Sequence, residues 1–463
     1  MFASEPIPGK LLIKLTAGTS IENVVAQIPY QVLSYKYRRS TFKNNDPESE
    51  KTYALKFSES EEIKAIAETV KKIPGVIWAS LDYLVEQPRE PIKANRIIEN
   101  PGNHVKYEYP IGLACYLLET EHRYIRYIPV QEQILVAVID SGIKYTHKDL
   151  KDAIYINPGE IQGNGIDDDH NGLIDDYMGW DFSGYSDNGG NNNPNPFTPH
   201  ATELAGIIGG KKDDQFGIEG INPDCKILNL KFEVSLEDAS YAIRYAVDMG
   251  AKIINCSWVS GPDSTFARES FAYAVQQGCI VVVAAGNQGT SVSSTGFCPQ
   301  IFPDMTLVTS HTGDEQGVGV RRRYGGANYG PEVSFAAYGY DVHTTGVDES
   351  QPNSDTGTSL AAPIVVGILS RIWANNPSLT RQQVLDKAIQ YTVRLDSGTG
   401  YGRIDSEALA KSYVTVQTKK VDLNLSGKKG TLEVDYVTGG GKTKRFSEYF
   451  YYGGRKYSIH REM

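Results

Sequence analysis

The feature that most constrains the fold is a series of short, β-branched apolar runs that alternate with stretches of helical periodicity. Strands are expected at residues 134–140, 226–232, 252–257, 279–285 and 306–309. Helices are expected at residues 236–249, 266–277, 360–374 and 381–391. The runs lack polar alternation, so both faces of the sheet must be covered, and strands separated by helices run parallel. We therefore expect an α/β fold, a parallel sheet flanked by helices, with its functional groups at the carboxyl ends of the strands.

Different patterns lie on both sides of this region. Before it, a β-α-β-β-α-β order is expected at residues 10–15, 21–28, 31–37, 52–57, 59–72 and 76–83. This order is the ferredoxin-like split motif. After residue 414, strand-like runs at 421–425, 431–436 and 445–452 indicate a small β appendage. We expect a ferredoxin-like domain at 1–90, a linker and entry segment at 91–130, the α/β domain at 131–413 and a C-terminal β module at 414–463.

The composition excludes several classes of protein. Of 463 residues, 40% are apolar and 22% are charged, which is typical of a soluble globular chain. A net charge of −10 argues against nucleic acid as a partner. The longest apolar runs fall well short of the ~20 residues that a membrane span needs. The cysteines form no CxxC pair, so we expect no zinc site and most of them as small buried hydrophobes. They are Cys115, Cys225, Cys256, Cys279 and Cys298.

Three short motifs supply polar groups to the α/β region. Asp140 ends the strand-like run in VAVIDSG, His200 opens the apolar helix HATELAGIIG, and Ser359 lies at the start of the helix in GTSLAAP. Taken singly, Asp140 and Ser359 are better explained as caps than as catalytic groups, and His200 is explained at least as well as a structural histidine or a helper at the helix N-terminus. Pro363 is expected in the first turn of the helix that follows Ser359, where proline is tolerated.

Together these three residues meet one chemical requirement. A serine hydroxyl is a poor nucleophile until a histidine removes its proton, and the histidine needs an acid that fixes its tautomer and offsets the imidazolium charge. The start of a helix also places Ser359 at the positive end of the helix dipole, which favours developing negative charge. The combination favours nucleophilic catalysis by Ser359 with His200 and Asp140.

The segments VIDSG, HAT and GTSLAAP resemble the three signature blocks of the subtilisin-like serine proteases (subtilases), in the same order along the chain. The resemblance extends from about residue 135 to about residue 409. It implies a catalytic domain that cuts peptide bonds with Asp140, His200 and Ser359. It also implies that Asn287, in VVVAAGNQG, donates its side-chain NH₂ to the oxyanion beside the backbone N–H of Ser359. The alternative for Asn287 is a turn residue that tolerates left-handed geometry.

The sequence departs from the family at three places. Ala201 stands where subtilases usually have glycine, and its methyl group would crowd the substrate or shift His200 unless the backbone φ is negative. Trp258 and Val259 are expected to narrow the substrate pocket, while main-chain pairing with an extended substrate survives. Residues 106–130 fit the family poorly. The substrate-binding residues that the resemblance implies are Ser257, Trp258, Val259 and Gly286.

An acidic loop, DDDHNGLIDD, places oxygen ligands at alternating positions before a glycine, as in the first half of an EF-hand loop. The twelfth residue is Met178, so the usual glutamate is missing. Crowded carboxylates repel one another, and many subtilases carry a similar insertion, so we expect a calcium ion; the alternative is a solvated acidic turn. The expected ligands are Asp167, Asp169, Asn171, Asp175 and Asp176. Resemblance to thermitase-like members implies a second calcium site at Asp149 and Asp214.

The ferredoxin-like segment resembles the prodomain of subtilases. The resemblance implies that it templates folding of the α/β domain and that its tail, at residues 85–94, lies in the active-site cleft until it is cut. The intact chain would then be latent, with its own N-terminal domain as an intramolecular inhibitor. The alternative is an accessory domain with no inhibitory role.

These observations favour a calcium-dependent serine endopeptidase, made as a zymogen and monomeric, that acts on proteins or peptides through an acyl-enzyme. It should work at neutral pH or above, because His200 must be unprotonated. The first residues, MFASEP, lack the basic and apolar parts of a signal peptide, so we expect secretion or surface display by a signal outside this sequence, with an intracellular location left open. One alternative is a weak or inactive subtilase-fold binding protein whose N-terminal domain plugs the cleft. Another is a calcium-dependent structural surface protein.

Overall fold

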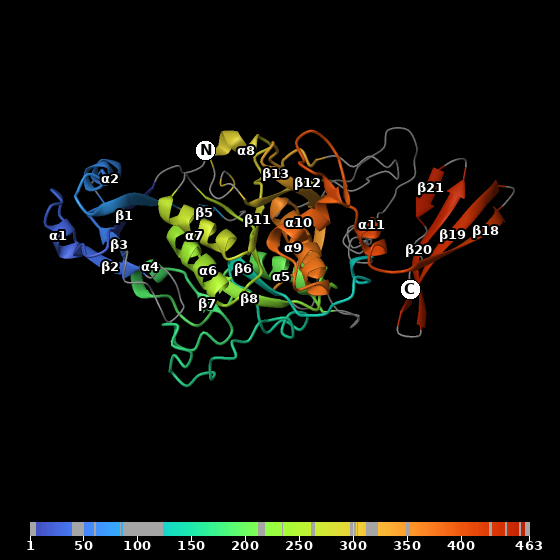
Figure 1. Ribbon diagram of the computed structural model, residues 1–463, viewed down its shortest axis with the longest axis horizontal. Coiled ribbons are helices and arrows are strands. Elements are labelled where there is room, and N and C mark those ends of the chain that lie inside the picture. The colour runs from blue at the N-terminus through green and yellow to red at the C-terminus, as the bar shows by residue number, and fades with distance from the viewer. Residues whose placement is uncertain are drawn as a thin grey trace.

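The computed structural model has three parts along its longest axis (Figure 1). An N-terminal unit lies at one end, a central α/β unit in the middle and a C-terminal antiparallel sheet at the other end. The structure describes residues 6–38, 51–59, 62–83, 85–86, 124–211, 218–233, 235–260, 264–296, 300, 302, 304–311, 323–348, 352–425, 428–439, 442–452 and 455–458. The expected linker and entry segment at 91–130 lies outside these residues as far as residue 123, as do two of the cysteines, Cys115 and Cys298. Cys225, Cys256 and Cys279 are buried.

The N-terminal unit has the β-α-β-β-α-β order. Its elements are β1 (Pro6–Leu15), α1 (Ile21–Val25), β2 (Ser34–Arg38), β3 (Lys51–Lys56), α2 (Ile63–Val70) and β4 (Val76–Tyr83). The strands form an antiparallel sheet in the order β2-β3-β1-β4. Alternate residues of β1, among them Leu11 and Ile13, form a small core with α2 residues such as Ile66, as the period of a half-buried strand requires.

A nine-stranded sheet forms the centre of the α/β unit, in the order β16-β17-β13-β12-β11-β9-β6-β8-β7. Its strands are β6 (Leu135–Asp140), β7 (Trp180–Asp181), β8 (Lys226–Lys231), β9 (Ile253–Cys256), β11 (Ile280–Ala284), β12 (Thr306–His311), β13 (Val333–Tyr338), β16 (Thr392–Val393) and β17 (Arg403–Ile404). All neighbouring pairs are parallel except β16 with β17. The expected parallel α/β fold is confirmed.

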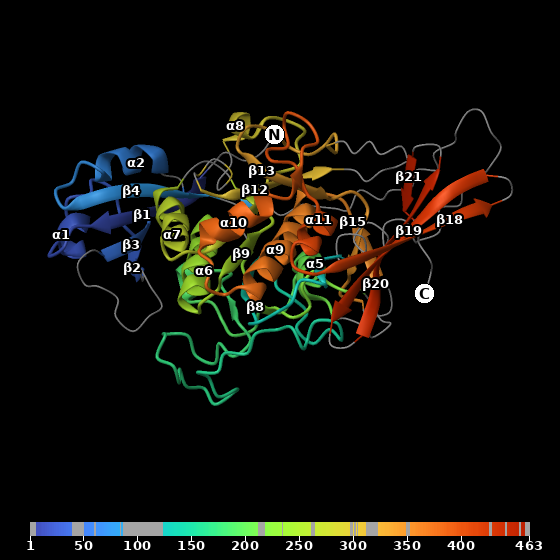
Figure 2. The same ribbon diagram turned by 45° about the vertical axis from the view of Figure 1, so that its right-hand side comes forward.

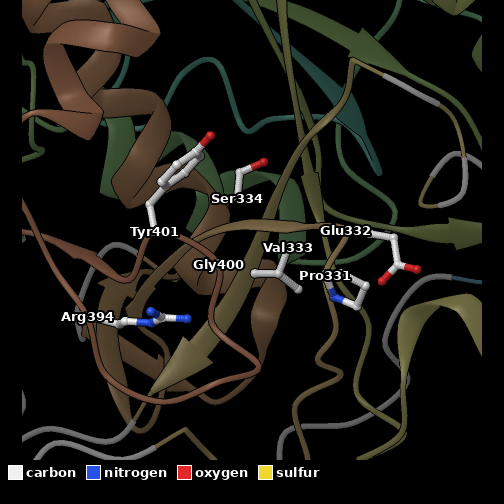
Figure 3. Close-up of a pocket in the computed structure, with 7 residues that line it drawn as sticks. All are labelled: Pro331, Glu332, Val333, Ser334, Arg394, Gly400 and Tyr401. Carbon is white, nitrogen blue, oxygen red and sulfur yellow. The ribbon is translucent and has the colours of Figure 1, made fainter.

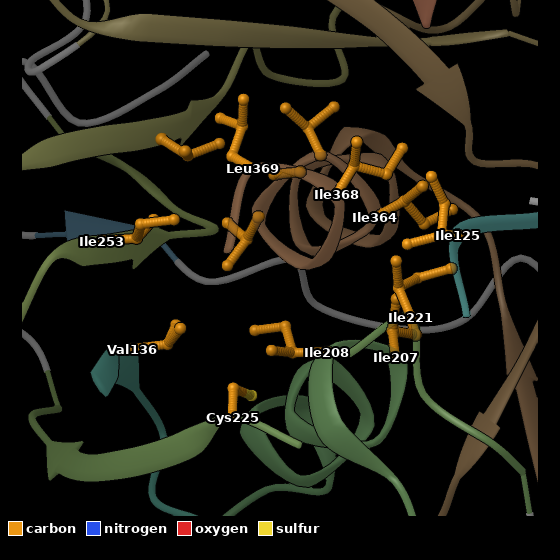
Figure 4. Close-up of a cluster of buried hydrophobic side chains, with 14 of the residues drawn as sticks. Ile125, Val136, Ile207, Ile208, Ile221, Cys225, Ile253, Ile364, Ile368 and Leu369 are labelled. Atoms are coloured by element: carbon orange, nitrogen blue, oxygen red, sulfur yellow. The ribbon is translucent and has the colours of Figure 1, made fainter. Parts of the chain in front are cut away.

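Helices cover both faces of this sheet because successive residues of each strand are apolar on opposite sides. Val136 and Val138 of β6 pack with α5 (His200–Gly209), α9 (Thr358–Asn375) and α10 (Arg381–Ile389), as Figure 4 shows in part. Ala137 and Ile139 pack on the other face, with α6 (Leu236–Asp248) and α7 (Thr265–Gln276). Serine N-caps begin α6 and α7, and a capping box begins α10. By length and composition α9 could cross a membrane, but it is buried in this core.

The remaining elements are short or peripheral. They are β5 (Val85–Glu86), α4 (Tyr185–Asn188), β10 (Val259–Ser260), α8 (Val292–Thr295), β14 (Val342–Thr345), β15 (Pro352–Asp355) and α11 (Ser406–Lys411). The C-terminal sheet contains β18 (Val416–Leu425), β19 (Lys428–Gly439), β20 (Lys442–Tyr452) and β21 (Arg455–Ser458), paired antiparallel in chain order. Sequence reasoning missed β13, the β14–β15 hairpin and β21.

Candidate active site

Asp140 and His200 form a buried hydrogen-bonded pair at the carboxyl edge of the central sheet. Asp140 is the last residue of β6, and His200 is the first residue of α5. The Asp140 Oδ1 atom accepts from the Ser141 backbone N–H at 2.7 Å and lies 2.9 Å from His200 Nδ1. This contact assigns the Nδ1–H tautomer to neutral His200, so that Nε2 is left as the basic nitrogen.

The environment of His200 favours its protonated form. Burial acts to lower the pKa of the imidazole, but the charge and hydrogen bond of Asp140, with the charges of Glu203 and Asp355, raise the pKa of His200 to about 9. The Nε2 atom is buried and has no hydrogen-bond partner. The site therefore contains a strong base whose reactive nitrogen is unoccupied.

Ser359 lies in the first turn of α9, which packs against α5. Its Oγ atom is buried and, like His200 Nε2, has no hydrogen-bond partner, so the two atoms are not bonded to each other in this structure. Catalytic hydrogen bonds are often long in the absence of substrate and shorten when it binds.

Pro363 lies one turn further into α9 than expected, because the helix begins at Thr358. Proline has no N–H to bond the carbonyl four residues earlier, which is that of Ser359. Ser257 Oγ donates to this carbonyl instead, at 2.9 Å, and Asn255 Nδ2 donates to Ser257 Oγ at 3.0 Å. Because Pro363 cannot bond it, the Ser359 carbonyl is available to Ser257. This hydrogen bond fixes Ser359 relative to the end of β9.

Asn287 follows β11, two strands from β6 in the sheet. Its Oδ1 atom accepts from the backbone N–H and the hydroxyl of Thr358, at 2.9 and 3.0 Å. These donors fix the orientation of the amide, so Nδ2 is available to another acceptor. A Cβ atom on Gly357 would lie 3.3 Å from Asn287 Nδ2 and 3.1 Å from Ser359 Oγ, so glycine at 357 leaves the space between these two atoms open.

The Asn287 loop depends on a residue that sequence reasoning missed. Asn328 is fully buried, donates from Nδ2 to the Ala285 carbonyl at 2.9 Å, and accepts at Oδ1 from the backbone N–H groups of Gln288 and Thr290. Gly286 has a φ of +99°, and a Cβ there would lie 2.5 Å from Asn328 Nδ2, so only glycine fits. No local pattern links Asn328 to a loop about forty residues earlier.

Hydrogen bonds with buried side chains fix the segment that the resemblance identifies as substrate-binding. Trp258, expected to narrow the pocket, is instead buried in the core, where its Nε1 donates to the Ile139 carbonyl at 2.9 Å. Buried Gln300, which sequence reasoning also missed, donates from Nε2 to the carbonyls of Trp258 and Ala284 at 3.0 and 2.8 Å. Its amide fixes this segment relative to the end of β11.

An extended segment of the N-terminal unit pairs with the strand that follows Trp258. Strand β5 (Val85–Glu86) pairs antiparallel with β10 (Val259–Ser260), with Val259 opposite Glu86 and Ser260 opposite Val85. Main-chain pairing of this kind accepts many side chains. The rest of the expected inhibitory tail lies outside the described residues.

Ala201 does not disturb the site. It belongs to the first turn of α5, its methyl group packs in the core, and its backbone N–H donates to Ser141 Oγ at 3.1 Å. Helical φ is negative, so the residue accepts a side chain without strain.

The acidic loop divides its carboxylates into two groups. Asp167 accepts from the backbone N–H groups of Asn171 and Gly172, and Asp175 accepts from those of residues 163–165. These two carboxylates therefore organise the loop. Asp169 and Asp176 instead meet Glu160, a residue that sequence reasoning did not include, with ligand oxygens within 4.8 Å of one another.

This second group fits a divalent cation that prefers oxygen ligands. The Asn157 and Asn171 side chains donate to both Asp169 and Asp176, and Tyr245 of α6 donates to Asp176 at 2.5 Å. Burial raises the pKa of Asp176, and the neighbouring charge of Asp169 raises it further, so bringing these carboxylates together is unfavourable without a cation. Three carboxylates are a ligand set typical of calcium.

The expected second calcium site is only half described. Asp149 is buried and its Oδ2 accepts from the Ile218 N–H at 3.2 Å, whereas Asp214 lies outside the described residues.

A cavity of about 570 Å³ lies away from these groups, at the start of β13 (Figure 3). Its lining includes Glu332, Arg394 and Tyr401. Since β13 runs parallel to β12 and hence to β6, its first residues lie at the opposite edge of the sheet from Asp140.

The chain is similar to several known proteins. Subtilisin-like protease 1 of Plasmodium berghei is 31% identical over 295 residues, 58% of this chain and 47% of that protein. The halolysin-like extracellular serine protease Nep of Natrialba magadii is 29% identical over 285 residues, 60% of this chain and 47% of that protein. The chain thus spans about half the length of these curated relatives. Fervidolysin of Fervidobacterium pennivorans, described as a keratinolytic enzyme related to subtilisin, shares the fold: its TM-score is 0.63 at 20% identity, over 98% of this chain and 69% of that one.

The Subtilase family profile matches residues 131–420, which is more than half of the chain and includes Asp140, His200, Asn287 and Ser359. The chain belongs to the subtilase family.

Proposed function

We propose that this protein is a calcium-dependent serine endopeptidase made as a zymogen. The observation that carries the proposal is the buried, hydrogen-bonded Asp140–His200 pair at one edge of the sheet. His200 Nε2 and Ser359 Oγ are both buried there without a hydrogen-bond partner. Buried polar atoms are rarely left unsatisfied. A substrate would engage both atoms, since its carbonyl carbon would be attacked by Ser359 Oγ while His200 Nε2 accepts the hydroxyl proton.

The reaction would be acyl transfer. Ser359 Oγ attacks the peptide carbonyl carbon while His200 Nε2 takes the hydroxyl proton, and Asp140 stabilises the imidazolium that forms. Asn287 Nδ2 and the Ser359 backbone N–H donate to the oxyanion, and loss of one such donor costs about 10²–10³ in turnover. The imidazolium then protonates the departing amine, and water, deprotonated by the same nitrogen, hydrolyses the acyl-enzyme.

The substrate would be an extended polypeptide that pairs with β10. Strand β5 already occupies β10 in the intact chain, which supports a latent precursor in which the N-terminal unit acts as inhibitor. We further propose secretion or surface display, since the relative Nep is named as extracellular.

Glu160, Asp169 and Asp176 would hold the calcium ion. The ion would supply positive charge that offsets the repulsion among three carboxylates. Its role would be structural, because Asp176 is bonded to Tyr245 of α6 and not to any residue of the triad.

Mass spectrometry after incubation with calcium tests this function. The wild-type chain should release an N-terminal fragment of roughly ninety residues, a size typical of a small domain, whereas Ser359→Ala should stay whole. A fluorophosphonate probe should label Ser359 in the trimmed wild type and not in the Ala variant. If neither the intact nor the trimmed wild-type chain is labelled, the protein is a subtilase-fold binding protein with a plugged cleft.

A further inference from the structure

Glu203 is a buried carboxylate close to His200 that the reaction above does not use. It follows His200 by three positions on α5, so the two side chains lie on one face of the helix, one turn apart. Only 3% of Glu203 is exposed. In the described part of the chain, no lysine or arginine forms an ion pair with it. A buried carboxylate without a cationic partner is unfavourable and calls for an explanation.

The β14–β15 hairpin holds Glu203 in this position. Asn353 of β15 donates from Nδ2 to Glu203 Oε1. Thr344 and Thr345 of β14 donate from their hydroxyls to the carbonyls of Glu203 and Thr202, at 2.6 and 2.8 Å. The side chain and the backbone of this helical turn are therefore anchored to one hairpin, so the carboxylate has a defined place.

The same hairpin supplies a second carboxylate. Asp355 ends β15, four residues before Ser359, and its Oδ1 accepts from the Thr356 N–H at 2.6 Å. His200 interacts electrostatically with Asp140, Glu203 and Asp355, so it has three acidic neighbours, one from β6, one from α5 and one from β15.

Other charged groups on the elements around α5 are engaged elsewhere. Lys231 of β8 pairs with Asp181 at 2.8 Å, and Lys144, in the loop after β6, donates to the Val347 carbonyl at 2.7 Å. His343 of β14 has Asp341 as its charged neighbour. On α9, Arg371 pairs with Asp224 at 2.6 Å. Among the charged groups that act on Glu203, His200 has the largest effect, followed by Asp355 and Asp140.

We propose that Glu203 is a positioning residue that sets the pH at which His200 changes protonation, with Asp355 as its weaker partner. The proposal rests on the proposed function for its biological meaning, but not for its test. Ionised Glu203 stabilises the imidazolium and makes Nε2 a stronger base. Burial raises the pKa of Glu203 to about 7, with His200 acting against this and Asp355 adding to it, so the two groups titrate as a coupled set.

The test measures the titration of His200 directly, in the full chain with Ser359→Ala so that no cleavage intervenes. Histidines are labelled with ¹⁵N, and the His200 signal is assigned by its loss in His200→Gln. Glu203→Gln keeps an acceptor for Asn353 and removes the charge, so the His200 midpoint should fall by roughly one pH unit. Asp355→Asn should lower it by less. Glu203→Asp keeps the charge, so its His200 midpoint should stay close to that of the parent.

Glu132→Gln is the matched control, since it removes the same charge from an exposed position before β6 and should leave the midpoint unchanged. An unchanged midpoint in Glu203→Gln would overturn the proposal. If that variant does not fold, Asp355→Asn carries the test, because equal midpoints in the parent and in Asp355→Asn would contradict a midpoint set by these two carboxylates. The readout needs no protease activity, so absence of peptide cleavage in the wild type would contradict the proposed function alone.

In the active chain, Glu203→Gln should move the acid limb of the kcat/KM profile to lower pH and reduce its plateau. Without the Glu203 charge, His200 loses its proton at a lower pH, but as a weaker base it removes the Ser359 proton less effectively. A residue with only a structural role would lower the plateau without moving the limb.

Discussion

The two end units lie on opposite sides of the central α/β unit (Figures 1 and 2), and their junctions with it differ in chemistry. At the N-terminal junction, Lys10 lies 3.0 Å from Asp82 and 2.7 Å from Glu237, and Arg38 lies 2.7 Å from the same Glu237. Asp82 and Glu237 are buried. This junction is a network of buried charges that crosses between β1, β2, β4 and α6.

The N-terminal unit also caps two helices of the central unit. Asp82 accepts from the Glu237 backbone N–H at 3.0 Å, at the start of α6, and Ser80 Oγ accepts from the Thr265 N–H at 2.9 Å, at the start of α7. Helix starts leave N–H groups unsatisfied and favour negative charge. Water would replace these caps in a central unit from which the N-terminal unit had separated.

The C-terminal junction is mainly apolar. Phe446 of β20 is fully buried, with ring centroids 5.3 Å from Tyr124 and 5.0 Å from Tyr127. An ion pair between Lys411 and Asp435, at 2.8 Å, lies beside it. Exposing the faces of these rings to water is unfavourable, because their hydration does not offset the lost apolar contacts. The contrast fits the proposed function, in which the N-terminal unit separates from the central unit and the C-terminal sheet stays.

The largest effect should come from breaking the charged network at its centre. Glu237→Ala leaves Lys10 and Arg38 without their shared partner, which costs about 3–5 kcal/mol for a buried pair. In the Ser359→Ala chain, amide exchange of β4 should accelerate about 10²–10⁴-fold, while β18 and β19 keep their protection. Glu68→Ala, which removes an exposed pair with Lys71, is the control. Equal acceleration in the C-terminal sheet would contradict independent junctions.

The apolar junction should respond to loss of one ring. Phe446→Ala is expected to lower the free energy of unfolding by about 3 kcal/mol, because it leaves a cavity between Tyr124 and Tyr127. Denaturant unfolding of the Ser359→Ala chain measures this, and exchange of β4 should not change. Val421→Ala, at a half-exposed position of β18, should alter stability by less than about 0.5 kcal/mol. If Phe446→Ala behaved like Val421→Ala, the sheet would not be held by its rings.

Calcium should stabilise α6, one of the two helices that the N-terminal unit caps. The reason is that Tyr245 of α6 is bonded to Asp176, one of the proposed calcium ligands. At a hundredfold excess over Kd the ion should add about 2.7 kcal/mol, seen as a rise in Tm that a chelator reverses. Glu160→Gln should abolish the rise. Asp167→Asn should lower Tm with and without calcium but keep the rise, since its carboxylate bonds the loop backbone. The reverse pattern would favour the ligand set read from the sequence.

Sequence reasoning found what local pattern determines. The apolar run before Asp140 and the helix that begins at His200 are visible in the chain, and the parallel fold follows from their alternation. It missed β15, because PNSD has neither apolar residues nor alternation, and with it the anchor of Glu203.

Other functional contacts also leave no local trace. Asn328 and Gln300 act on backbone groups of distant segments, and Glu160 joins Asp176 only once the loop has closed. Pro363 could be read as compatible with a helix, but its effect on the Ser359 carbonyl depends on Ser257, about a hundred residues earlier. Such roles follow from tertiary placement and not from spacing.

The smallest effect should be a pH dependence confined to the charged junction. Burial acts to lower the pKa of Lys10, but the charges of Asp82 and Glu237 outweigh it and raise the pKa above its ordinary 10.5. A raised pKa means that the docked unit holds the proton more tightly, so the contribution of Lys10 is complete below pH 10.5 and falls by up to about 1.4 kcal/mol per unit above it. In the Ser359→Ala chain, cut at a protease site inserted in the linker, size exclusion should show more separated N-terminal unit at pH 11 than at pH 9. Lys10→Arg, which stays charged, should remove that difference.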